Sequence, residues 1–405
     1  MVDITQAVIF AGGLGERLKP FTETNPKPMY RFNEKPFLEY LVLQIKEWGI
    51  KDIIILLGYL PEKIKDYFED GSNWGVSIRY VVTPVEYDTG FRLKAAEGYL
   101  NSTFLMMYCD NICPIDFERL KKDYEKNKAL IQVTVYSNDD LYTKNNMRIT
   151  GEGLVEVYDK KRTEKNLKGV DIGYALVSKD VLNYMSVNND NFEAIVYPKL
   201  ISEKRLYATT TKHRYYSIGS YERIELTEQY LSGRKYIFLD RDGVTNERPP
   251  KAEYVCKPED FKWLPGAKEA LKKLNEAGYF IILISNQAGI ARGVMTVNDF
   301  EKVQAKMATD LEEIGVRVGA VYYCPHGWND NCECRKPKPG MLYQAQKDYS
   351  INLTECVLIG DDERDIITAH NVNMKGILVT DEYSLNDAVN DVLHGIVKDY
   401  EVKDQ

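Results

Sequence analysis

The chain has 405 residues, of which 44% are hydrophobic and 28% charged, and its formal net charge at pH 7 is -8. This length and apolar content predict two or three folded domains and argue against disorder. The negative charge is spread along the chain, which argues against nucleic acid or an anionic membrane as a partner. Any anionic ligand must therefore be held by local groups.

No apolar run approaches membrane-spanning length, and residues 1–6 carry no basic stretch, so we expect a cytoplasmic protein. Three of the seven cysteines cluster with a histidine between Cys324 and Cys334, and the other four are scattered. This distribution suits a reducing compartment and one metal site better than a disulfide framework.

The first strand, predicted over 7–11, runs into a loop with Gly12, Gly13 and Gly15, followed by Arg17 and Lys27. Glycines after a strand let main-chain N–H groups approach phosphates closely, and the two cations can neutralise phosphate charge. We therefore predict a phosphate-binding loop, although its glycines match neither the Walker pattern nor the full dinucleotide fingerprint.

Helical and strand patterns alternate after this loop, which predicts an α/β fold with a mainly parallel, doubly wound sheet. Ligands bind such sheets at the carboxyl ends of the strands, where Asp110 follows the strand 104–108. The predicted helices are 37–48 and 62–68, and the other predicted strands are 52–57, 78–82 and 131–136.

The string Gly-x-Gly-x-Arg-x-x-Pro-x-Thr-x-x-x-Pro-Lys-Pro, which begins at Gly13, resembles the signature of sugar-1-phosphate nucleotidylyltransferases, such as the heptose and mannose-1-phosphate guanylyltransferases. The resemblance implies a Rossmann-like domain over 1–233 that joins a sugar 1-phosphate to the α-phosphate of a nucleoside triphosphate and releases pyrophosphate. It also implies roles for single residues: Gly12, Gly13 and Gly15 cradle the nucleotide, Arg17 stabilises pyrophosphate, Lys27 binds the α-phosphate and Asp110 holds Mg2+.

The sequence departs from that family in two places. Asp88-Thr89-Gly90-Phe91-Arg92 stands where the family has Gly-Thr-Gly-Gly-Ala, and we expect Thr89 and Gly90 to contact substrate. Ser217 stands where the family has its second metal-binding aspartate. Three consequences are open. The affinity for the metal is lower, or Asp171 in the substrate site takes the place of the missing aspartate, or the domain binds nucleotide without catalysis. Either Lys160 or Lys161 matches the family's sugar-phosphate lysine.

The second domain, expected over 234–405, opens with a strand ending at Leu239 that is followed by Asp240 and Asp242. Two carboxylates two positions apart can face one crevice, where one attacks phosphorus while the other moves a proton. Three later elements supply groups to the same edge of the sheet. They are Ser285 and Asn286 after a strand at 279–284, the basic pair Arg335 and Lys336, and Asp361 after a strand that begins at 357.

Together these four elements resemble the haloacid dehalogenase (HAD) superfamily of phosphatases without a cap domain. The resemblance implies an aspartyl-phosphate on Asp240, with Asp242 as general acid and base. It implies Mg2+ bound by Asp240, Asp361 and the main-chain carbonyl of Asp242. Ser285, Asn286 and Lys336 would hold the transferring phosphoryl group, with Arg335 assisting.

A short loop carries Cys324, His326, Cys332 and Cys334 as a Cys-x-His and a Cys-x-Cys pair. Three sulfurs and one nitrogen are the donor set of a tetrahedral Zn2+, with no position left for water. We therefore predict a structural zinc that fixes the loop presenting Arg335 and Lys336.

The zinc loop and its flanking motifs are similar to the heptose-1,7-bisphosphate phosphatases and their histidinol-phosphatase relatives, although Asp362 stands where the former carry lysine. The first hypothesis is a bifunctional enzyme that dephosphorylates D-glycero-D-manno-heptose 1,7-bisphosphate and transfers GMP from GTP to give GDP-heptose. The alternatives are a non-catalytic N-terminal sensor, or histidinol phosphate or another sugar phosphate as substrate. The anomer, the base, channelling, the final glycan and a homo-oligomer stay open.

Overall fold

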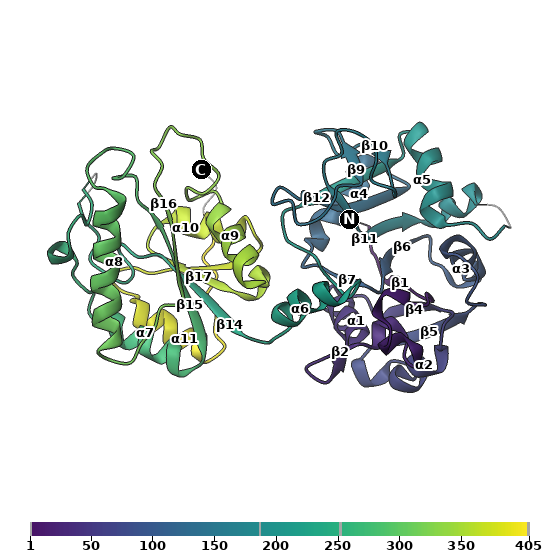
Figure 1. Cartoon of the computed structure of the whole chain (residues 1–405), viewed down its shortest axis with the longest axis horizontal. Helices are drawn as coiled ribbons and strands as arrows, with labels where there is room; N and C mark the ends of the chain where they lie inside the picture. The colour runs from purple at the N-terminus through teal and green to yellow at the C-terminus, as the bar shows by residue number, and fades with distance from the viewer. Residues whose placement is uncertain (1, 186–187, 251–252, 403–405) are drawn as a thin grey trace. The chain divides into compact units, whose positions relative to one another are not determined.

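The computed structural model describes residues 2–185, 188–250 and 253–402, and the chain divides into two compact units, Met1–Leu231 and Ser232–Gln405 (Figure 1). The sequence places the boundary after Gly233, close to this division. Within the described residues, no helix has both the length and the apolar character needed to cross a membrane.

The N-terminal unit is built on a seven-stranded sheet in the order β12-β8-β11-β6-β1-β4-β5. All neighbouring pairs are parallel except those of β11, which runs antiparallel to both β6 and β8. The strands are β1 (Gln6–Ala11), β4 (Asp52–Leu57), β5 (Ser77–Val82), β6 (Thr103–Tyr108), β8 (Ile131–Tyr136), β11 (Val170–Ser178) and β12 (Leu206–Thr211). Short two-stranded pairs join β2 (Arg31–Phe32) to β3 (Lys35–Pro36), β7 (Asn111–Ile112) to β13 (Tyr216–Ser217), and β9 (Met147–Ile149) to β10 (Val155–Tyr158).

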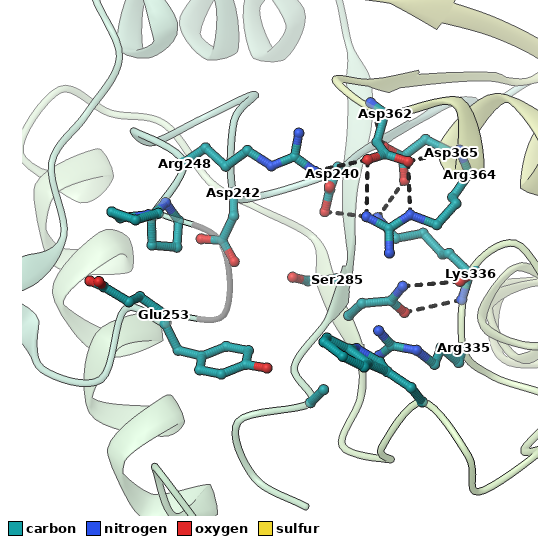
Figure 2. A pocket seen from close by; sticks show the side chains of 16 residues that line it. Asp240, Asp242, Arg248, Glu253, Ser285, Arg335, Lys336, Asp362, Arg364 and Asp365 are labelled. Atoms are coloured by element: carbon teal, nitrogen blue, oxygen red, sulfur yellow. Dashed lines mark hydrogen bonds and ion pairs between the residues drawn. The ribbon is translucent and has the colours of Figure 1, made fainter. Parts of the chain in front are cut away.

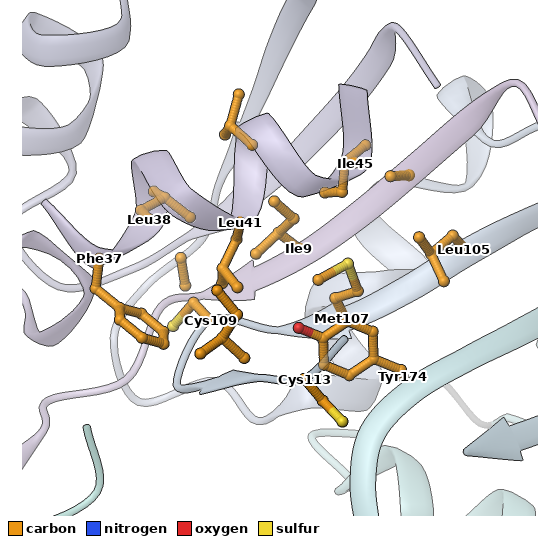
Figure 3. Packing of buried hydrophobic residues seen from close by; sticks show 14 of the residues in the cluster. Ile9, Phe37, Leu38, Leu41, Ile45, Leu105, Met107, Cys109, Cys113 and Tyr174 are labelled. Carbon is orange, nitrogen blue, oxygen red and sulfur yellow. The ribbon is translucent and has the colours of Figure 1, made fainter. Parts of the chain in front are cut away.

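Both faces of this sheet are buried, because successive side chains of a strand point to opposite faces. Ala7 and Ile9 of β1 belong to the apolar cluster that includes residues of α1 (Phe37–Glu47), α2 (Pro61–Phe68) and α4 (Phe117–Asn127). Figure 3 shows part of this cluster, with Leu41 of α1 beside Ile9. Val8 and Phe10 belong instead to a second cluster with α3 (Thr89–Ala95) and α5 (Phe192–Ser202).

The C-terminal unit has a fully parallel five-stranded sheet in the order β16-β15-β14-β17-β18. One face packs on α7, α8 and α11, and the other on α9 and α10 (Figure 1). The strands are β14 (Lys235–Leu239), β15 (Tyr279–Asn286), β16 (Ala320–Cys324), β17 (Val357–Gly360) and β18 (Lys375–Leu378). The helices are α7 (Ala267–Glu276), α8 (Val297–Glu312), α9 (Gly340–Tyr349), α10 (Glu363–His370) and α11 (Leu385–Leu393), and α6 (Tyr221–Tyr230) ends the N-terminal unit.

The structure confirms the predicted α/β class with two doubly wound units. The predicted strands and helices agree with the observed ones to within one or two residues. Parallel strands bring the loops after β1 and β6 to one edge of the first sheet, and those after β14 and β17 to one edge of the second. The predicted site residues follow these strands.

Leu41→Ala should lower the free energy of unfolding by about 3 kcal/mol, because it leaves a cavity at a fully buried position. Leu141→Ala removes the same atoms from a side chain that is 81% exposed and should change stability by less than about 0.5 kcal/mol. Urea denaturation followed by circular dichroism checks both variants. Equal losses would contradict the packing described for α1.

Candidate active sites

A pocket of about 550 Å3 lies at the carboxyl edge of the five-stranded sheet. Figure 2 shows Asp240, Asp242 and Ser285 facing a common space, with Lys336 and Asp365 beside Asp240. The groups that sequence motifs predicted for phosphoryl transfer therefore converge, although they come from separate strand ends.

Lys336 is the buried cation of this pocket. Its Nζ lies 2.9 Å from Asp240 Oδ1 and 2.6 Å from Asp365 Oδ1, and it donates to the carbonyl of Ile284 at 3.2 Å. Burial disfavours its charge, but Asp240 and Asp365 outweigh burial and raise the pKa of Lys336. Burial raises the pKa of Asp240 to about 7 against the opposing effect of Lys336, while Asp365 and Asp361 add to the rise.

Asp240, Asp361 and Asp365 form a carboxylate cluster in which one oxygen from each residue lies within 4.8 Å of the others. Burial raises the pKa of Asp361 to about 6 despite the nearby Arg248, which indicates a group that gains from a bound cation. An all-oxygen cluster fits Mg2+. Asp365 lies in the first turn of α10, four residues after Asp361 and in the same stretch of sequence, but sequence reasoning gave it no role.

Gly243 allows Asp361 to enter this cluster. Its φ is +95°, and a Cβ there would lie 1.8 Å from Asp361 Oδ2. No side chain fits at this distance, so the glycine after Asp242 is required both by backbone conformation and by the close approach of the carboxylate.

Asp242 is held as a carboxylate by three donors. It accepts hydrogen bonds from the Arg241 guanidinium, from Asn246 Nδ2 at 2.9 Å and from Gln287 Nε2 at 2.9 Å. Burial acts to raise its pKa, but Arg241 and these hydrogen bonds outweigh burial and hold the pKa below its ordinary value. Because an approaching phosphate anion would raise this pKa again, Asp242 is suited to change protonation state during a reaction.

The remaining predicted groups line the same pocket with different contacts. Ser285 accepts a hydrogen bond from Gln287 Nε2 at 2.8 Å. The amide of Asn286 is bonded at both ends to the main chain of Lys336, at 3.0 and 3.1 Å, so it positions the loop of the cation. Arg335 reaches the pocket and donates to the carbonyl of His326 at 3.4 Å.

An ion-pair network that sequence reasoning missed lies at the rim of the pocket. Asp362 accepts from Arg364 Nε at 2.8 Å and from Arg248 Nη2 at 2.9 Å, and Arg248 Nη1 lies 3.2 Å from Asp361 Oδ2. Arg248 lies outside the motifs, in the loop after β14, and Arg364 lies in the first turn of α10. The structure therefore places two cations beside the Asp362 carboxylate.

The four predicted zinc ligands form one cluster. Cys324 Sγ lies 3.6 Å from both His326 Nδ1 and Cys332 Sγ, Cys334 Sγ lies 3.6 Å from Cys332 Sγ, and His326 Nδ1 lies 3.2 Å from Cys334 Sγ. Zinc bonds of ~2.3 Å to sulfur and ~2.0 Å to nitrogen would separate tetrahedral ligands by about 3.8 Å for two sulfurs and about 3.5 Å for nitrogen and sulfur. The donor set and spacing fit this metal.

A second pocket, of about 220 Å3, lies at the carboxyl edge of the seven-stranded sheet. Lys27 and Asp110 face each other in it, with Lys27 Nζ 2.7 Å from Asp110 Oδ2. Burial opposes both charges, but their pairing keeps the pKa of Asp110 low and that of Lys27 high. The exposed Arg17 also lowers the pKa of Asp110. The pocket is also lined by Gly12, Gly13, Gly15 and Thr89.

Thr89 and Gly90 are largely engaged with the segment before α5. The Thr89 hydroxyl accepts from the N–H of Phe192 at 2.9 Å, and the N–H of Gly90 donates to the carbonyl of Asp190 at 3.0 Å. A Cβ on Gly90 would lie 2.4 Å from that carbonyl. The start of α3 therefore packs against residues 190–192, and Thr89 also lines the pocket.

Ser217 and Asp171, the two residues discussed for the second metal position, lie in different surroundings. Ser217 pairs with Asn111 in the short β13–β7 ladder, next to Asp110. Asp171 is bonded to the N–H of Gly173 at 2.9 Å and to the Tyr197 hydroxyl at 3.3 Å. Burial raises the pKa of Asp171 to about 7. Asp171 therefore lies beside Tyr197, and the nearby Glu193 carboxylate adds to the rise of its pKa.

Fold and site together define two classes of phosphate chemistry in one chain. A nucleotidyl transferase family model matches residues 6–164, and a HAD-hydrolase-like model matches residues 333–399. A solved putative glucose-1-phosphate thymidylyltransferase from Bacillus anthracis shares the N-terminal fold at 19% identity and a TM-score of 0.50, over 56% of this chain and 95% of its own.

The curated relatives match over the C-terminal unit. The D-glycero-beta-D-manno-heptose-1,7-bisphosphate 7-phosphatase of Helicobacter pylori is 39% identical over 150 residues, which are 37% of this chain and 85% of the relative. The alpha-anomer phosphatase of Photorhabdus laumondii is 41% identical over 139 residues, 33% of this chain and 74% of the relative. Through this unit the chain belongs to the D-glycero-D-manno-heptose-1,7-bisphosphate 7-phosphatase family, and the matching nucleotidyl transferase domain precedes it.

Gly243→Ala should lower phosphatase activity by at least ~100-fold, because the added Cβ displaces Asp361 from the carboxylate cluster. Gly278→Ala is the matched control, since Gly278 has a φ of +80° with no atom within 4 Å of an added Cβ. Both variants should lose roughly 1 kcal/mol of stability from the strained φ. Mg2+-dependent release of phosphate from an aryl phosphate measures the difference, and an active Gly243→Ala protein would contradict the assignment of Asp361.

Proposed function

We propose that the chain catalyses two consecutive steps of sugar-nucleotide synthesis. The C-terminal unit removes the 7-phosphate of D-glycero-D-manno-heptose 1,7-bisphosphate. The N-terminal unit then transfers a nucleotidyl group, GMP from GTP, to the 1-phosphate and forms GDP-heptose. The observation that carries the proposal is Lys336 bridging Asp240 and Asp365 beside Asp361, in a unit 39% identical to a heptose bisphosphate phosphatase.

In the first step a carboxylate oxygen of Asp240 attacks phosphorus, and the bond from phosphorus to the sugar oxygen breaks. Asp242 gives its proton to the leaving sugar oxygen. It then takes a proton from a water molecule, which attacks the aspartyl-phosphate and regenerates Asp240. Lys336 and Ser285 hold the phosphoryl oxygens, Arg335 assists, and Asn286 keeps the Lys336 main chain in place.

In the second step an oxygen of the sugar 1-phosphate attacks the α-phosphorus of the nucleoside triphosphate, and pyrophosphate leaves. Lys27 neutralises the α-phosphate, Arg17 neutralises the pyrophosphate, and the loop at Gly12 and Gly13 binds the nucleotide. The pairing of the two units in one chain supports a heptose 1-phosphate as the acceptor, because this is the product of a heptose 1,7-bisphosphatase. The choice of GTP follows from the resemblance to guanylyltransferases that use such sugar phosphates.

Both sites have metal partners in this proposal. Asp240, Asp361 and the carbonyl of Asp242 would bind Mg2+ together with Asp365, and Asp110 would bind Mg2+ in the nucleotide site. A bound Mg2+ supplies charge neutralisation for the attacking and leaving oxygens. Cys324, His326, Cys332 and Cys334 would bind a structural Zn2+ that fixes the loop before Lys336.

Ser217 motivates one alternative for the N-terminal unit. A serine cannot supply the charge of a second carboxylate beside Asp110, so a nucleotide-binding module without turnover is the competing function. For the C-terminal unit, histidinol phosphate or another sugar phosphate competes, because Asp362 departs from the lysine that the resemblance to heptose bisphosphate phosphatases implies at this position. Comparing kcat/KM for these substrates separates them.

A paired assay tests the whole proposal. Purified protein with Mg2+ and heptose 1,7-bisphosphate receives each of four nucleoside triphosphates, and phosphate and pyrophosphate are followed separately. Release of both, with one nucleotide preferred, is expected. Phosphate alone would support the non-catalytic N-terminal module, and no phosphate would contradict the heptose assignment.

Asp240→Asn and Asp110→Asn should each abolish or reduce a different one of the two activities. The first should abolish phosphate release and leave pyrophosphate release from heptose 1-phosphate and nucleotide unchanged, because it removes only the nucleophile of the C-terminal site. The second should reduce pyrophosphate release by at least ~100-fold and spare phosphate release. Loss of both activities in either variant would argue against two separate sites.

Cys332→Ser should lower zinc content and the thermal midpoint together, because one of four ligands is lost. Cys256→Ser is the matched control, since Cys256 lies outside the cluster. Atomic absorption and differential scanning calorimetry measure the two quantities. A zinc-free Cys332→Ser protein of unchanged stability would refute a structural metal.

A further inference from the structure

Arg92 is the unusual residue of the nucleotide pocket. It lies on α3, in the stretch Asp88-Thr89-Gly90-Phe91-Arg92, and only 4% of it is exposed. Its Nη1 donates to the carbonyl of Leu57 at 2.7 Å and to the Thr83 hydroxyl at 2.5 Å. Its Nη2 donates to the carbonyls of Gly12, Pro84 and Val85 at 3.3, 3.2 and 3.0 Å. One guanidinium thereby joins the loops that follow β1, β4 and β5.

The guanidinium is held by neutral acceptors. Within the described residues no carboxylate forms an ion pair with Arg92, and burial is the main influence on its pKa, which is lowered. A buried cation is costly unless its donors are satisfied, and the planar fork of arginine can satisfy several carbonyls at once. Lysine has the same charge but cannot reproduce this set of hydrogen bonds.

Two glycines make room for the guanidinium. A Cβ on Gly12 would lie 2.6 Å from Arg92 Cζ, and one on Gly58 would lie 2.5 Å from Nη1. The missing side chain of Gly12 therefore leaves space for the Arg92 guanidinium. In the proposed function it also lets the main chain of Gly12 approach a phosphate closely. The glycine loop and the altered stretch at residues 88–92 form one packed unit.

The carbonyls that Arg92 holds fix the directions of the next N–H groups. In a trans peptide the C=O and the following N–H point to opposite sides, and the described residues contain cis bonds only before Pro20 and Pro337. The N–H groups of Gly13, Val85 and Glu86 therefore point away from the guanidinium. None of the three donates a hydrogen bond within the described part of the chain. Gly13 and Val85 line the pocket.

We propose that Arg92 is a positioning residue that aims the main-chain N–H groups of Gly13, Val85 and Glu86 at acceptor atoms of the nucleoside triphosphate. Arg92 also lines this pocket, and in the proposal it acts on the nucleotide through the loops whose carbonyls it holds. The inference rests on the proposed nucleotidyl transfer.

Arg92→Lys tests the proposal in the whole protein. The KM for the active nucleoside triphosphate should rise ~10-fold or more while kcat and the KM for heptose 1-phosphate change less than about threefold, because ground-state hydrogen bonds are lost. Arg79→Lys is the matched control, since Arg79 lies exposed on β5 and should leave all three constants unchanged. An unchanged nucleotide KM in a folded Arg92→Lys protein would overturn the proposal.

Hydrogen exchange in the wild-type protein gives a second test that does not depend on a variant folding. Addition of the active nucleoside triphosphate with Mg2+ should slow exchange in peptides containing Gly13 and the pair Val85 and Glu86, but not in peptides from α8. Bound nucleotide without this protection would overturn the role of the three N–H groups. Absence of turnover with all four nucleotides would instead contradict the proposed function, and with it the basis of this inference.

Discussion

Three carboxylates crowd around one ammonium group at the carboxyl edge of the five-stranded sheet. Asp240, Asp361 and Asp365 are held within one cluster, and Lys336 bonds two of them from a buried position. Removing such charges from water costs several kcal/mol per ion unless each is paired. Three carboxylates against Lys336 and Arg248, which lies 3.2 Å from Asp361 Oδ2, leave a formal excess of one negative charge, which a bound divalent cation would offset. Much of the surrounding structure serves this cluster, including Gly243 beside Asp361 and the Asn286 amide that fixes the Lys336 main chain.

The N-terminal unit also neutralises charged groups at its pocket, but with fewer carboxylates. Lys27 and Asp110 neutralise each other beside the glycine loop, and the buried guanidinium of Arg92 donates to the carbonyl of Gly12 in that loop. Both units place their charged groups after parallel strands, where loops from distant parts of the chain meet. The two sites thus share one architectural rule, although one forms a covalent intermediate on Asp240 and the other transfers a nucleotidyl group directly in the proposed reactions.

The sequence predicted the groups that directly follow strands, because the change from an apolar run to an acidic or glycine-rich turn is local. It did not predict Asp365, which reaches the cluster from the first turn of α10, or Arg248, which depends on the path of a loop. It did not predict β11, because Asp171 and Gly173 interrupt the apolar pattern of that strand, and its antiparallel direction depends on tertiary structure. Arg92 was also missed, because an arginine in a helix is usually exposed, and only tertiary structure buries it.

A handover experiment tests the central claim that the two sites act in sequence on one sugar. The Asp240→Asn protein with Mg2+ and GTP is given either heptose 1,7-bisphosphate or heptose 1-phosphate, and nucleotide-sugar formation is measured. The account predicts GDP-heptose from the monophosphate and none from the bisphosphate, with wild-type protein forming it from both. GDP-linked product carrying a retained 7-phosphate, formed as fast as GDP-heptose, would contradict the proposed order of the two steps.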